Sequence, residues 1–249
     1  MTILITGASA GFGKALVRHF AVRQHQVIAC ARRPEPLAAL AEEFPHQVLP
    51  LILDVRNRSA VVNALNGLPP HLRDIDVLIN NAGLALGIEP AHQANFEDWE
   101  TMIMTNCLGL ASVTHAILPS MVRRKKGRII NIGSIAGEVP YPGGNVYGAT
   151  KAFVHQFTNN LNADLIGTGV MATSIEPGLC GGTEFSEVRF KGDVGKAAAP
   201  YRGVRPLSPQ DIVDAVAWAV ERPNHVTINQ ITLMPNCQSF AGLNVDRCS

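Results

Sequence analysis

The alternation of short apolar runs with longer helical patterns most restricts the fold of this 249-residue chain. The apolar runs are rich in β-branched residues and lack the in-and-out pattern of a strand with one wet face. Strands of this kind are covered on both faces. Strand and helix in alternation indicate βαβ units, and therefore an α/β fold with a doubly wound parallel sheet.

The patterns give a set of expected elements. Strands are predicted at Ile3–Thr6, Val27–Ala31, Val48–Leu53, Val77–Asn80, Arg128–Ile132, Ala172–Glu176 and Ile228–Leu233. Helices are predicted at Gly11–Arg23, Pro36–Phe44, Ser59–Leu65, Asp98–Arg124, Val146–Ile166 and Pro209–Glu221. A hydrophobic content of 47% suffices for one large core, and no linker or repeat divides the chain, so a single domain over residues 1–249 is expected. Only the segment Gly178–Arg205 lacks a pattern, and we expect a functional loop there.

Charge and composition argue against several classes of protein. A net charge of +1 provides no field for nucleic acid or an anionic membrane. No apolar run approaches the roughly 20 residues of a membrane helix, and the N-terminus resembles a first strand instead of a secretion signal, so a cytoplasmic protein is expected. The cysteines are odd in number and show no CxxC spacing, which favours a reducing compartment: Cys30, Cys107, Cys180, Cys237 and Cys248. No His or Cys spacing indicates a metal site.

Two surface features each have two interpretations. The basic run Arg123–Arg128 could bind nucleic acid or an acidic carrier protein, but cations also suit a helix C-terminus, and the second interpretation is favoured. The predicted helices Asp98–Arg124 and Val146–Ile166 carry more apolar surface than one sheet face covers. We infer a homo-oligomer interface there, with burial inside one chain as the alternative.

A glycine-rich turn follows the first predicted strand and opens the first helix. Gly7, Gly11 and Gly13 permit a tight turn and a close backbone approach to a pyrophosphate, at a helix N-terminus with free N–H groups. The spacing is G-x-x-x-G-x-G, and its position between strand and helix makes it informative. The residues of this turn predicted to bind a nucleotide cofactor are Gly7, Ser9, Ala10, Gly11, Phe12 and Gly13.

The ends of the next strands refine the prediction of a nucleotide site. Arg32 and Arg33 stand where a site for NAD usually carries an acid for the ribose 2′-hydroxyl. Guanidinium groups suit a 2′-phosphate, so NADP(H) is the predicted cofactor. Asp54, before Val55, could meet the adenine edge or cap the next helix. Asn80–Gly83 has amides and small residues that let a nucleotide lie against the chain, which adds Asn81, Ala82 and Gly83 to the predicted site.

Tyr147 and Lys151 stand four residues apart on a predicted helix and share one face of it. An ammonium beside a phenol favours the phenolate, which would lower the tyrosine pKa from about 10 toward working pH. Such a group suits carbonyl/alcohol interconversion. Ser134 follows a strand at its carboxyl end, where open parallel sheets bind ligands, so it should meet Tyr147 and the glycine turn in one crevice. No G-x-S-x-G elbow surrounds Ser134 to suggest a hydrolase.

These residues together resemble the short-chain dehydrogenase/reductase family in order and spacing: Gly7/Gly11/Gly13, Asn80–Gly83, Asn106, Ser134 and Tyr147 with Lys151. Further stretches resemble the subgroup of NADP-dependent 3-hydroxy acid dehydrogenases, which act on serine, allo-threonine and short semialdehydes: Asn80–His92, Gly143–Phe153, Glu176–Gly192 and Gln238–Val245. The resemblance implies a homotetramer and a Rossmann-type sheet of about seven strands. Ile135 and Cys180 depart from the usual pattern without removing a chemical group, although Cys180 could make its loop sensitive to oxidation.

The resemblance also implies roles for individual residues. Tyr147 would be the acid/base, and Ser134 would bond the substrate oxygen. Lys151 would lower the tyrosine pKa and bond the nicotinamide ribose, and Asn106 would hold a water linked to Lys151. The residues implied to border the nicotinamide are Pro177, Gly178 and Thr183.

The substrate carboxylate of a 3-hydroxy acid requires a cation, for which Arg189, Lys191 and Arg202 are candidates in the long loop. Three functions remain open at this point: an NADP-dependent dehydrogenase of small 3-hydroxy acids, a reductase of another carbonyl such as a 3-oxoacyl thioester, and a non-enzymatic NADP-binding protein. The intact serine, tyrosine and lysine argue against the last.

Overall fold

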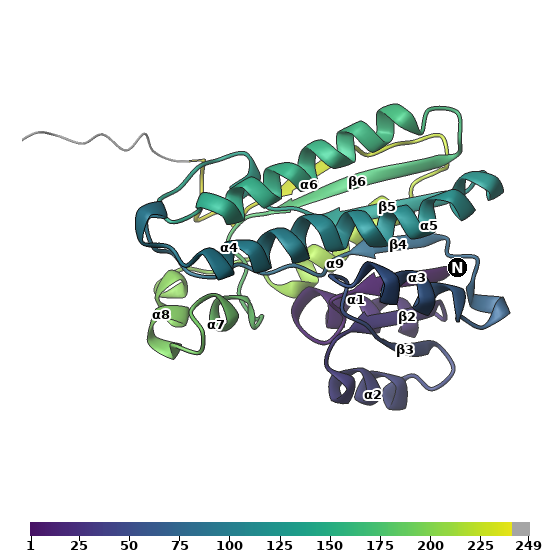
Figure 1. Ribbon diagram of the computed structural model, residues 1–249, viewed down its shortest axis with the longest axis horizontal. Helices are drawn as coiled ribbons and strands as arrows, with labels where there is room; N and C mark the ends of the chain where they lie inside the picture. The colour runs from purple at the N-terminus through teal and green to yellow at the C-terminus, as the bar shows by residue number, and fades with distance from the viewer. Residues whose placement is uncertain (241–249) are drawn as a thin grey trace, which may run out of the picture.

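The structure is a computed structural model that describes residues 1–240 (Figure 1). A parallel sheet runs through its centre. The strands are β1 (Thr2–Thr6), β2 (Gln26–Ala31), β3 (Val48–Ile52), β4 (Val77–Asn80), β5 (Gly127–Ile132), β6 (Val170–Pro177) and β7 (Gln230–Leu233). The helices are α1 (Gly11–Val22), α2 (Pro34–Glu43), α3 (Arg58–Asn66), α4 (Phe96–Ile103), α5 (Leu110–Arg124), α6 (Asn145–Asp164), α7 (Phe185–Arg189), α8 (Val194–Ala198) and α9 (Pro209–Val220).

The sheet has seven strands in the order β3-β2-β1-β4-β5-β6-β7, and all pairs are parallel. The chain order reverses direction between β1 and β4, which makes the carboxyl ends of these strands the expected ligand crevice of a doubly wound sheet. The predicted α/β Rossmann-type fold is therefore confirmed, and each predicted strand is present within two residues of its expected bounds.

Two apolar cores cover the two faces of the sheet. Side chains of α1, α2 and α9 pack on one face, with Phe20, Leu40 and Val216 among the buried residues. Side chains of α3, α5 and α6 pack on the other, where Val61 and Ile117 are buried. The central strands are thus buried on both faces, as expected, whereas β3 and β7 at the sheet edges are half-exposed, and for them the prediction was wrong.

Local sequence signals account for the helix starts. Ser208 and Asp211 form a capping box at the start of α9, where Pro209 occupies the first turn. Asn57 caps α3 through the backbone N–H of Ala60. Because Asn57 caps α3, Asp54 does not cap this helix, and the interpretation of Asp54 as a helix cap is excluded.

The predicted helix Asp98–Arg124 is interrupted. Helix α4 passes into a single π-helical segment, η3 (Met104–Gly109), before α5 begins. The combined helical run Phe96–Arg124 is apolar enough, with a mean hydropathy of 1.4 over its best window, to match a membrane span by length and composition. Half of that window is buried inside the protein, which is typical of the core helix of a globular domain. The expectation that no apolar run approaches the length of a membrane helix was therefore wrong. The burial of half of the window inside the protein explains why this helical run is apolar.

The structure also describes the unpatterned segment Gly178–Arg205 and the basic run Arg123–Arg128. The unpatterned segment Gly178–Arg205 contains the short helices α7 and α8 instead of an irregular loop. In the basic run, Arg124 and Lys126 pair with Asp76, and buried Arg128 donates to the backbone carbonyls of Ala219 and Pro223, in and after the last turn of α9. These contacts support the structural interpretation of the run.

Candidate active site

A cleft of about 730 Å³ lies at the carboxyl ends of the strands and gathers almost every residue predicted for the site. Its walls come from the glycine turn, the strand ends, α6 and the segment that includes α7. The predicted residues that line it are Gly7, Ser9, Ala10, Gly11, Phe12, Arg32, Arg33, Asp54, Val55, Asn81, Ala82, Gly83, Ser134, Tyr147, Lys151, Pro177, Gly178, Thr183 and Arg189. Gly13 and Asn106 are outside the cleft lining.

The glycine turn has the shape that a pyrophosphate requires. Gly7 and Gly11 have φ values of +67° and +50°, which disfavour a side chain. A Cβ on Gly13 would overlap the carbonyl oxygen of Gly7, so only glycine permits this close packing. Ala10, the first residue before α1, makes no side-chain cap, which leaves the first N–H groups of the helix available for an anion. The residues present therefore fit a dinucleotide.

Asn81 braces this turn from the neighbouring strand. Its amide nitrogen donates to the carbonyl oxygens of Thr6 (2.9 Å) and Gly7 (3.1 Å). The hydroxyl of Thr6 accepts from the backbone N–H groups of Asn81 and Ala82, both at 3.0 Å. Thr6 was not predicted as a site residue, although it directly precedes the glycine turn. Its contacts join β1 and β4 at the switch point and hold the floor of the cleft.

Arg32 and Arg33 lie at the rim of the cleft but differ in their contacts. Arg33 donates to Ser9 at 3.0 Å and pairs with Glu184 at 2.8 Å, so it links the second strand to the segment after β6. Arg32 is exposed, and within residues 1–240 its side chain makes no hydrogen bond or ion pair. Arg32 is thus the more available of the two guanidinium groups for an anionic ligand.

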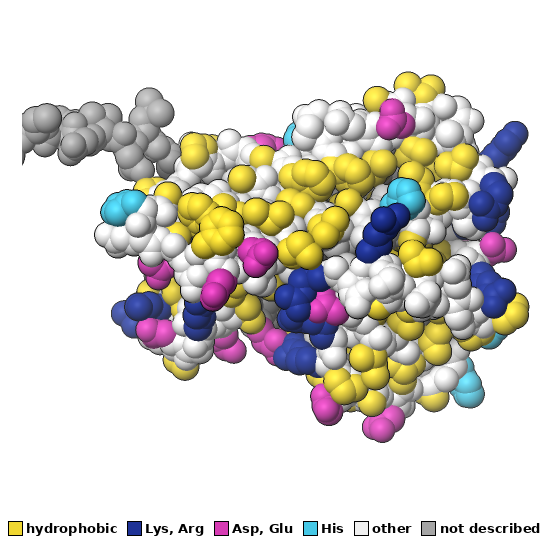
Figure 2. Space-filling view, in the orientation of Figure 1, with side chains coloured by type: hydrophobic (Ala, Val, Ile, Leu, Met, Phe, Trp, Pro, Cys, Tyr) yellow, Lys and Arg dark blue, Asp and Glu magenta, His cyan; other side chains and the backbone are white. Residues whose placement is uncertain are grey.

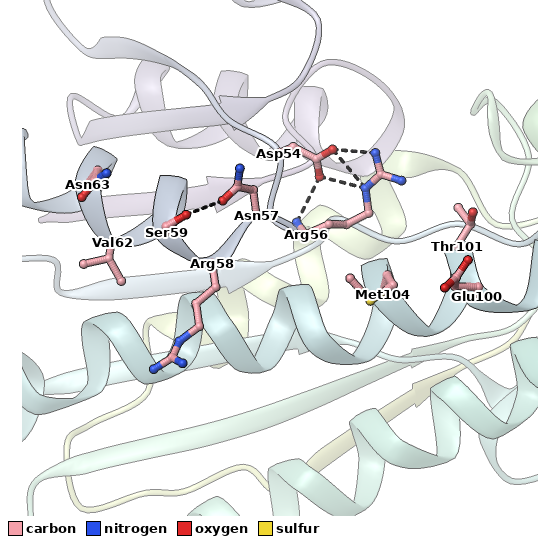
Figure 3. Close-up of a pocket in the computed structure, with 10 residues that line it drawn as sticks. All are labelled: Asp54, Arg56, Asn57, Arg58, Ser59, Val62, Asn63, Glu100, Thr101 and Met104. Atoms are coloured by element: carbon pink, nitrogen blue, oxygen red, sulfur yellow. Dashed lines mark hydrogen bonds and ion pairs between the residues drawn. The ribbon is translucent and has the colours of Figure 1, made fainter. Parts of the chain in front are cut away.

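Asp54 and Arg56 line both the cleft and a second groove beside it, whose lining residues are drawn in Figure 3. The carboxylate of Asp54 pairs with Arg56 at 2.6 Å, and the hydrogen bonds from Arg56 hold the pKa of Asp54 below its usual range. The groove continues between the start of α3 and the α4–η3 junction, where Arg58 and Glu100 face it. Asp54 therefore remains charged at neutral pH, beside buried Val55.

Tyr147, Lys151 and Ser134 meet at the centre of the cleft. Tyr147 and Lys151 are 8% and 7% exposed, and the Lys151 nitrogen lies 5.8 Å from the centre of the tyrosine ring. Lys151 donates to the carbonyl oxygen of Ile132 at 2.8 Å, which fixes the ammonium against the end of β5. The hydroxyl of Ser134 accepts the backbone N–H of Ala136 at 3.1 Å, and it lies close enough to Tyr147 to lower the pKa of the phenol. A proton donor, a hydroxyl and a cation thus converge on one point.

The pKa directions at this point differ from the sequence-based expectation. Burial raises the pKa of Tyr147 above its usual value, and the nearby hydroxyl of Ser134 and the charge of Arg189 oppose this rise only partly. Burial also lowers the pKa of Lys151 to about 8. The expected lowering of the tyrosine pKa by Lys151 was therefore wrong for the protein chain by itself. A protonated phenol at neutral pH suits donation to a carbonyl.

Asn106 lies in the π-helical segment and supports the site from behind. Its side-chain oxygen accepts the backbone N–H of Leu84 at 2.9 Å, and its nitrogen donates to the carbonyl of Leu84 and to the hydroxyl of Thr150. The π-helical widening aims this amide at the chain after β4 instead of along the helix. Asn106 thus connects three elements around Lys151, while its predicted role in holding a water stays a prediction.

Arg189 is the only one of the three predicted substrate cations that lines the cleft. Its guanidinium lies 5.8 Å from the Tyr147 ring centre, donates to the Tyr141 hydroxyl and bonds the carbonyl oxygen of Gly87. Lys191 pairs with Asp98 at 2.8 Å outside the cleft, and Arg202 is exposed outside it.

Several cleft residues were not predicted from the sequence. Phe185 of α7 packs on Tyr147 with ring centres 5.7 Å apart. Gln238 accepts the backbone N–H of Leu179 at 2.7 Å and so ties the end of the described chain to the segment after Pro177. Gln238 begins the stretch Gln238–Val245 that supported the resemblance, and residues 241–245 of it lie outside the described residues, as does Cys248.

Burial raises the pKa of Cys180 to about 12, which disfavours the thiolate that oxidation requires.

Comparison with known proteins places the chain among dehydrogenases. Residues 1–193 match the short chain dehydrogenase family. The NADP-dependent 3-hydroxy acid dehydrogenase of Salmonella typhi is 59% identical over 247 residues, which cover 99% of this chain and 100% of that protein. The serine 3-dehydrogenase of Rhizobium radiobacter is 48% identical over 246 residues, covering 99% and 98% of the two chains.

Two solved structures of dehydrogenases have the same fold as this chain. The closed form of serine dehydrogenase complexed with NADP⁺ has a TM-score of 0.98 to this chain, with 56% identity over all of both chains. Serine dehydrogenase from Escherichia coli has a TM-score of 0.86 and 50% identity, over 96% of this chain and 100% of that one.

Proposed function

Because the chain belongs to the short-chain dehydrogenase family and is an oxidoreductase, we propose that it interconverts small 3-hydroxy acids with the matching 3-oxo acids or semialdehydes, using NADP(H). Serine, allo-threonine and 3-hydroxypropionate are the proposed hydroxy acids. One observation carries the proposal: the guanidinium of Arg189 lies beside the ring of Tyr147, so a carboxylate and a reacting carbonyl can be held at one place.

Tyr147 is the proposed proton donor and acceptor. Its raised pKa keeps the phenol protonated at neutral pH, ready to donate to the oxygen of a carbonyl that is being reduced. Ser134, beside Tyr147 in the cleft, would hold that same oxygen. When bound, NADP(H) supplies or accepts the hydride. Burial of the tyrosine excludes water from the proton transfer.

Lys151 and Asn106 are proposed to complete the proton path. The buried ammonium of Lys151 lies beside the tyrosine ring, and it would bond the nicotinamide ribose. Asn106, through Leu84 and Thr150, fixes the surroundings of that ammonium. Since burial lowers the lysine pKa to about 8, its charge is sensitive to pH in a range that can be measured.

The proposed cofactor site follows the glycine turn and the arginine pair. Arg32 would bind the 2′-phosphate, because its guanidinium has no other partner among residues 1–240. Arg33 would join it on loosening its contact with Glu184. Asp54 and Val55 would border the adenine, and Asn81, Ala82 and Gly83 the adjoining ribose. The proposed contacts of the nicotinamide are Pro177, Gly178 and Thr183.

The substrate carboxylate is proposed to bind Arg189. Its Nε and Nη2 atoms are engaged with Gly87 and Tyr141, while within the described residues Nη1 makes no hydrogen bond. A guanidinium held by two contacts and offering its remaining N–H groups is preorganised for a carboxylate.

A substrate panel tests the proposed function. NADPH oxidation is followed with malonic semialdehyde, an acetoacetyl thioester and propanal, and NADP⁺ reduction with L-serine and L-allo-threonine. Preference for the small acids over propanal by at least tenfold in kcat/KM is expected. Preference for the thioester would replace the proposal by the alternative of a 3-oxoacyl reductase, and inactivity toward every small acid would refute it.

Assembly and location belong to the same proposal. Exposed apolar side chains gather on α4, η3 and α6 in one face of the molecule (Figure 2): Phe96, Ile103, Leu108 and Phe153. We expect this face to be covered in a homotetramer formed by single-domain chains in the cytoplasm. Light scattering after gel filtration should give the mass of four chains. A mass of one chain at micromolar concentration would contradict the tetramer.

A further inference from the structure

A fully buried carboxylate lies behind the proposed catalytic serine. Glu176, near the end of β6, is 0% exposed. One of its oxygens accepts the backbone N–H of Ser134, and the other accepts the hydroxyl of Ser174. Burying a carboxylate is costly unless each oxygen has a partner. Here one of those partners is the backbone of a residue that is proposed to bond the substrate.

The neighbouring backbone makes room for this carboxylate. A Cβ on Gly133 would overlap both oxygens of Glu176, so the carboxylate packs directly on the chain that leads to Ser134. Gly133 itself donates its N–H to the carbonyl of Ile175 at 2.7 Å. The position of Ser134 is therefore set by the carboxylate and by the β5–β6 ladder, while its hydroxyl accepts the backbone N–H of Ala136 and donates weakly to the carbonyl of Pro177 at 3.4 Å.

Helix α6 places a histidine on the far side of the same carboxylate. The Nδ1 atom of His155 lies 3.5 Å from Glu176 and 3.8 Å from Glu138. Its Nε2 atom is 3.1 Å from the side-chain amide nitrogen of Asn159. If that nitrogen donates, the ring proton of a neutral histidine sits on Nδ1, aimed at Glu176. This Nδ1 atom is buried and makes no hydrogen bond within residues 1–240, so the carboxylate of Glu176 is the nearest acceptor it faces.

The charge of Glu176 also acts on Lys151. Burial lowers the pKa of Lys151 to about 8, and the negative charge of Glu176 is the largest influence that opposes this. The charged and titratable groups around Glu176 are His155 and Lys151 from α6, with Glu138 beyond His155. Glu138 in turn accepts from Gln230 of β7 and is half-exposed.

We infer that Glu176 is a positioning residue of the hydride-transfer site: its carboxylate fixes the backbone of Ser134 and sustains the charge of Lys151, and His155 orients it from behind. This inference rests on the proposed roles of Ser134 and Lys151. Glu176 touches neither the substrate nor the cofactor in this account. It acts through two residues that do.

Two variants separate the two actions. Glu176→Gln keeps an oxygen for the Ser134 N–H but removes the charge, so the alkaline limb of the pH profile of kcat should move down by on the order of one pH unit, with little change of its plateau. Glu176→Asp keeps the charge but withdraws the oxygen, so the plateau of kcat should fall about tenfold while KM and the limb stay near those of the wild type. Glu138→Gln, the matched control, should leave limb and plateau unchanged.

A direct titration distinguishes failure of this inference from failure of the proposed function. In protein with ¹³C-labelled lysine and no substrate, the Lys151 signal, assigned with Lys151→Met, should titrate lower in Glu176→Gln than in the wild type. Circular dichroism and NADPH binding check folding, and Glu176→Asp alone still tests the anchor if Glu176→Gln does not fold. An unchanged Lys151 titration in Glu176→Gln, or an unchanged plateau in Glu176→Asp, would overturn the inference whichever carbonyl the enzyme reduces.

Discussion

Replacement of Arg189 by methionine should separate recognition of the carboxylate from chemistry at the carbonyl. Methionine keeps much of the side-chain length and apolar contact, while it removes the charge 5.8 Å from the Tyr147 ring. A hydrogen bond to a charged group contributes about 1.5–3 kcal/mol. Arg189 is only part-buried, so the lower part of that range applies, and the loss in kcat/KM for malonic semialdehyde should be about 10- to 50-fold.

The assay compares an acidic with a neutral substrate. Propanal has no carboxylate, so its binding does not depend on Arg189. The guanidinium of Arg189 lowers the pKa of Tyr147, and removing it therefore leaves the phenol protonated at neutral pH. Propanal kcat/KM should therefore change less than about threefold. Lys191→Met is the matched control, since Lys191 is a cation of the same segment whose ion pair with Asp98 lies outside the cleft.

Two results would refute the reasoning. An equal loss for both substrates would mean that Arg189 supports Tyr147 and does not bind the carboxylate. No loss for either would remove Arg189 from the site. Tyr141→Phe, which deletes one of the contacts that hold the guanidinium, should give a smaller loss confined to the acidic substrate.

Three further predictions concern the cofactor site and the lysine. Arg32→Ala should raise the Kd for NADPH at least tenfold in a fluorescence titration and that for NADH less than about twofold; equal losses would contradict binding of the 2′-phosphate. Gly13→Ala should lower stability by about 1–3 kcal/mol in thermal melts, because the new Cβ overlaps the Gly7 carbonyl, and a melt as high as that of Gly195→Ala would show that the turn tolerates it. With a lysine pKa of about 8, the ammonium of Lys151 is present at lower pH and lost above it, so NADPH-dependent reduction should decline as pH rises through about 8; a flat profile to pH 10 would contradict the loss of a required charge on Lys151 near pH 8.

Much of the fold follows from local patterns. The buried strands are continuous apolar runs, and the glycine turn opens a helix as its spacing indicates, so these elements are predictable one at a time. Tyr147 and Lys151 are also predictable, because their separation of four residues fixes a shared helix face. Ser134 could be placed beside them since strand ends meet at one edge of a parallel sheet.

The remaining features depend on contacts between distant parts of the chain. The π-helical turn around Asn106 arises where its amide reaches Leu84 and Thr150, and no local signal marks it. The role of Glu176 has no local signal, because Ser134 and His155, which it contacts, lie after β5 and in α6. The pKa of Tyr147 depends on burial by Phe185 and its neighbours, which outweighs the nearby cation considered from the sequence.

The most direct test of the account is the turnover of Tyr147→Phe with malonic semialdehyde, measured together with NADPH binding by fluorescence. Removing only the hydroxyl leaves the ring packed on Phe185, so NADPH should bind within about threefold of the wild type while kcat falls by at least about 100-fold. A variant that binds NADPH normally and retains more than a tenth of the wild-type kcat would contradict the role of Tyr147 as the proton donor.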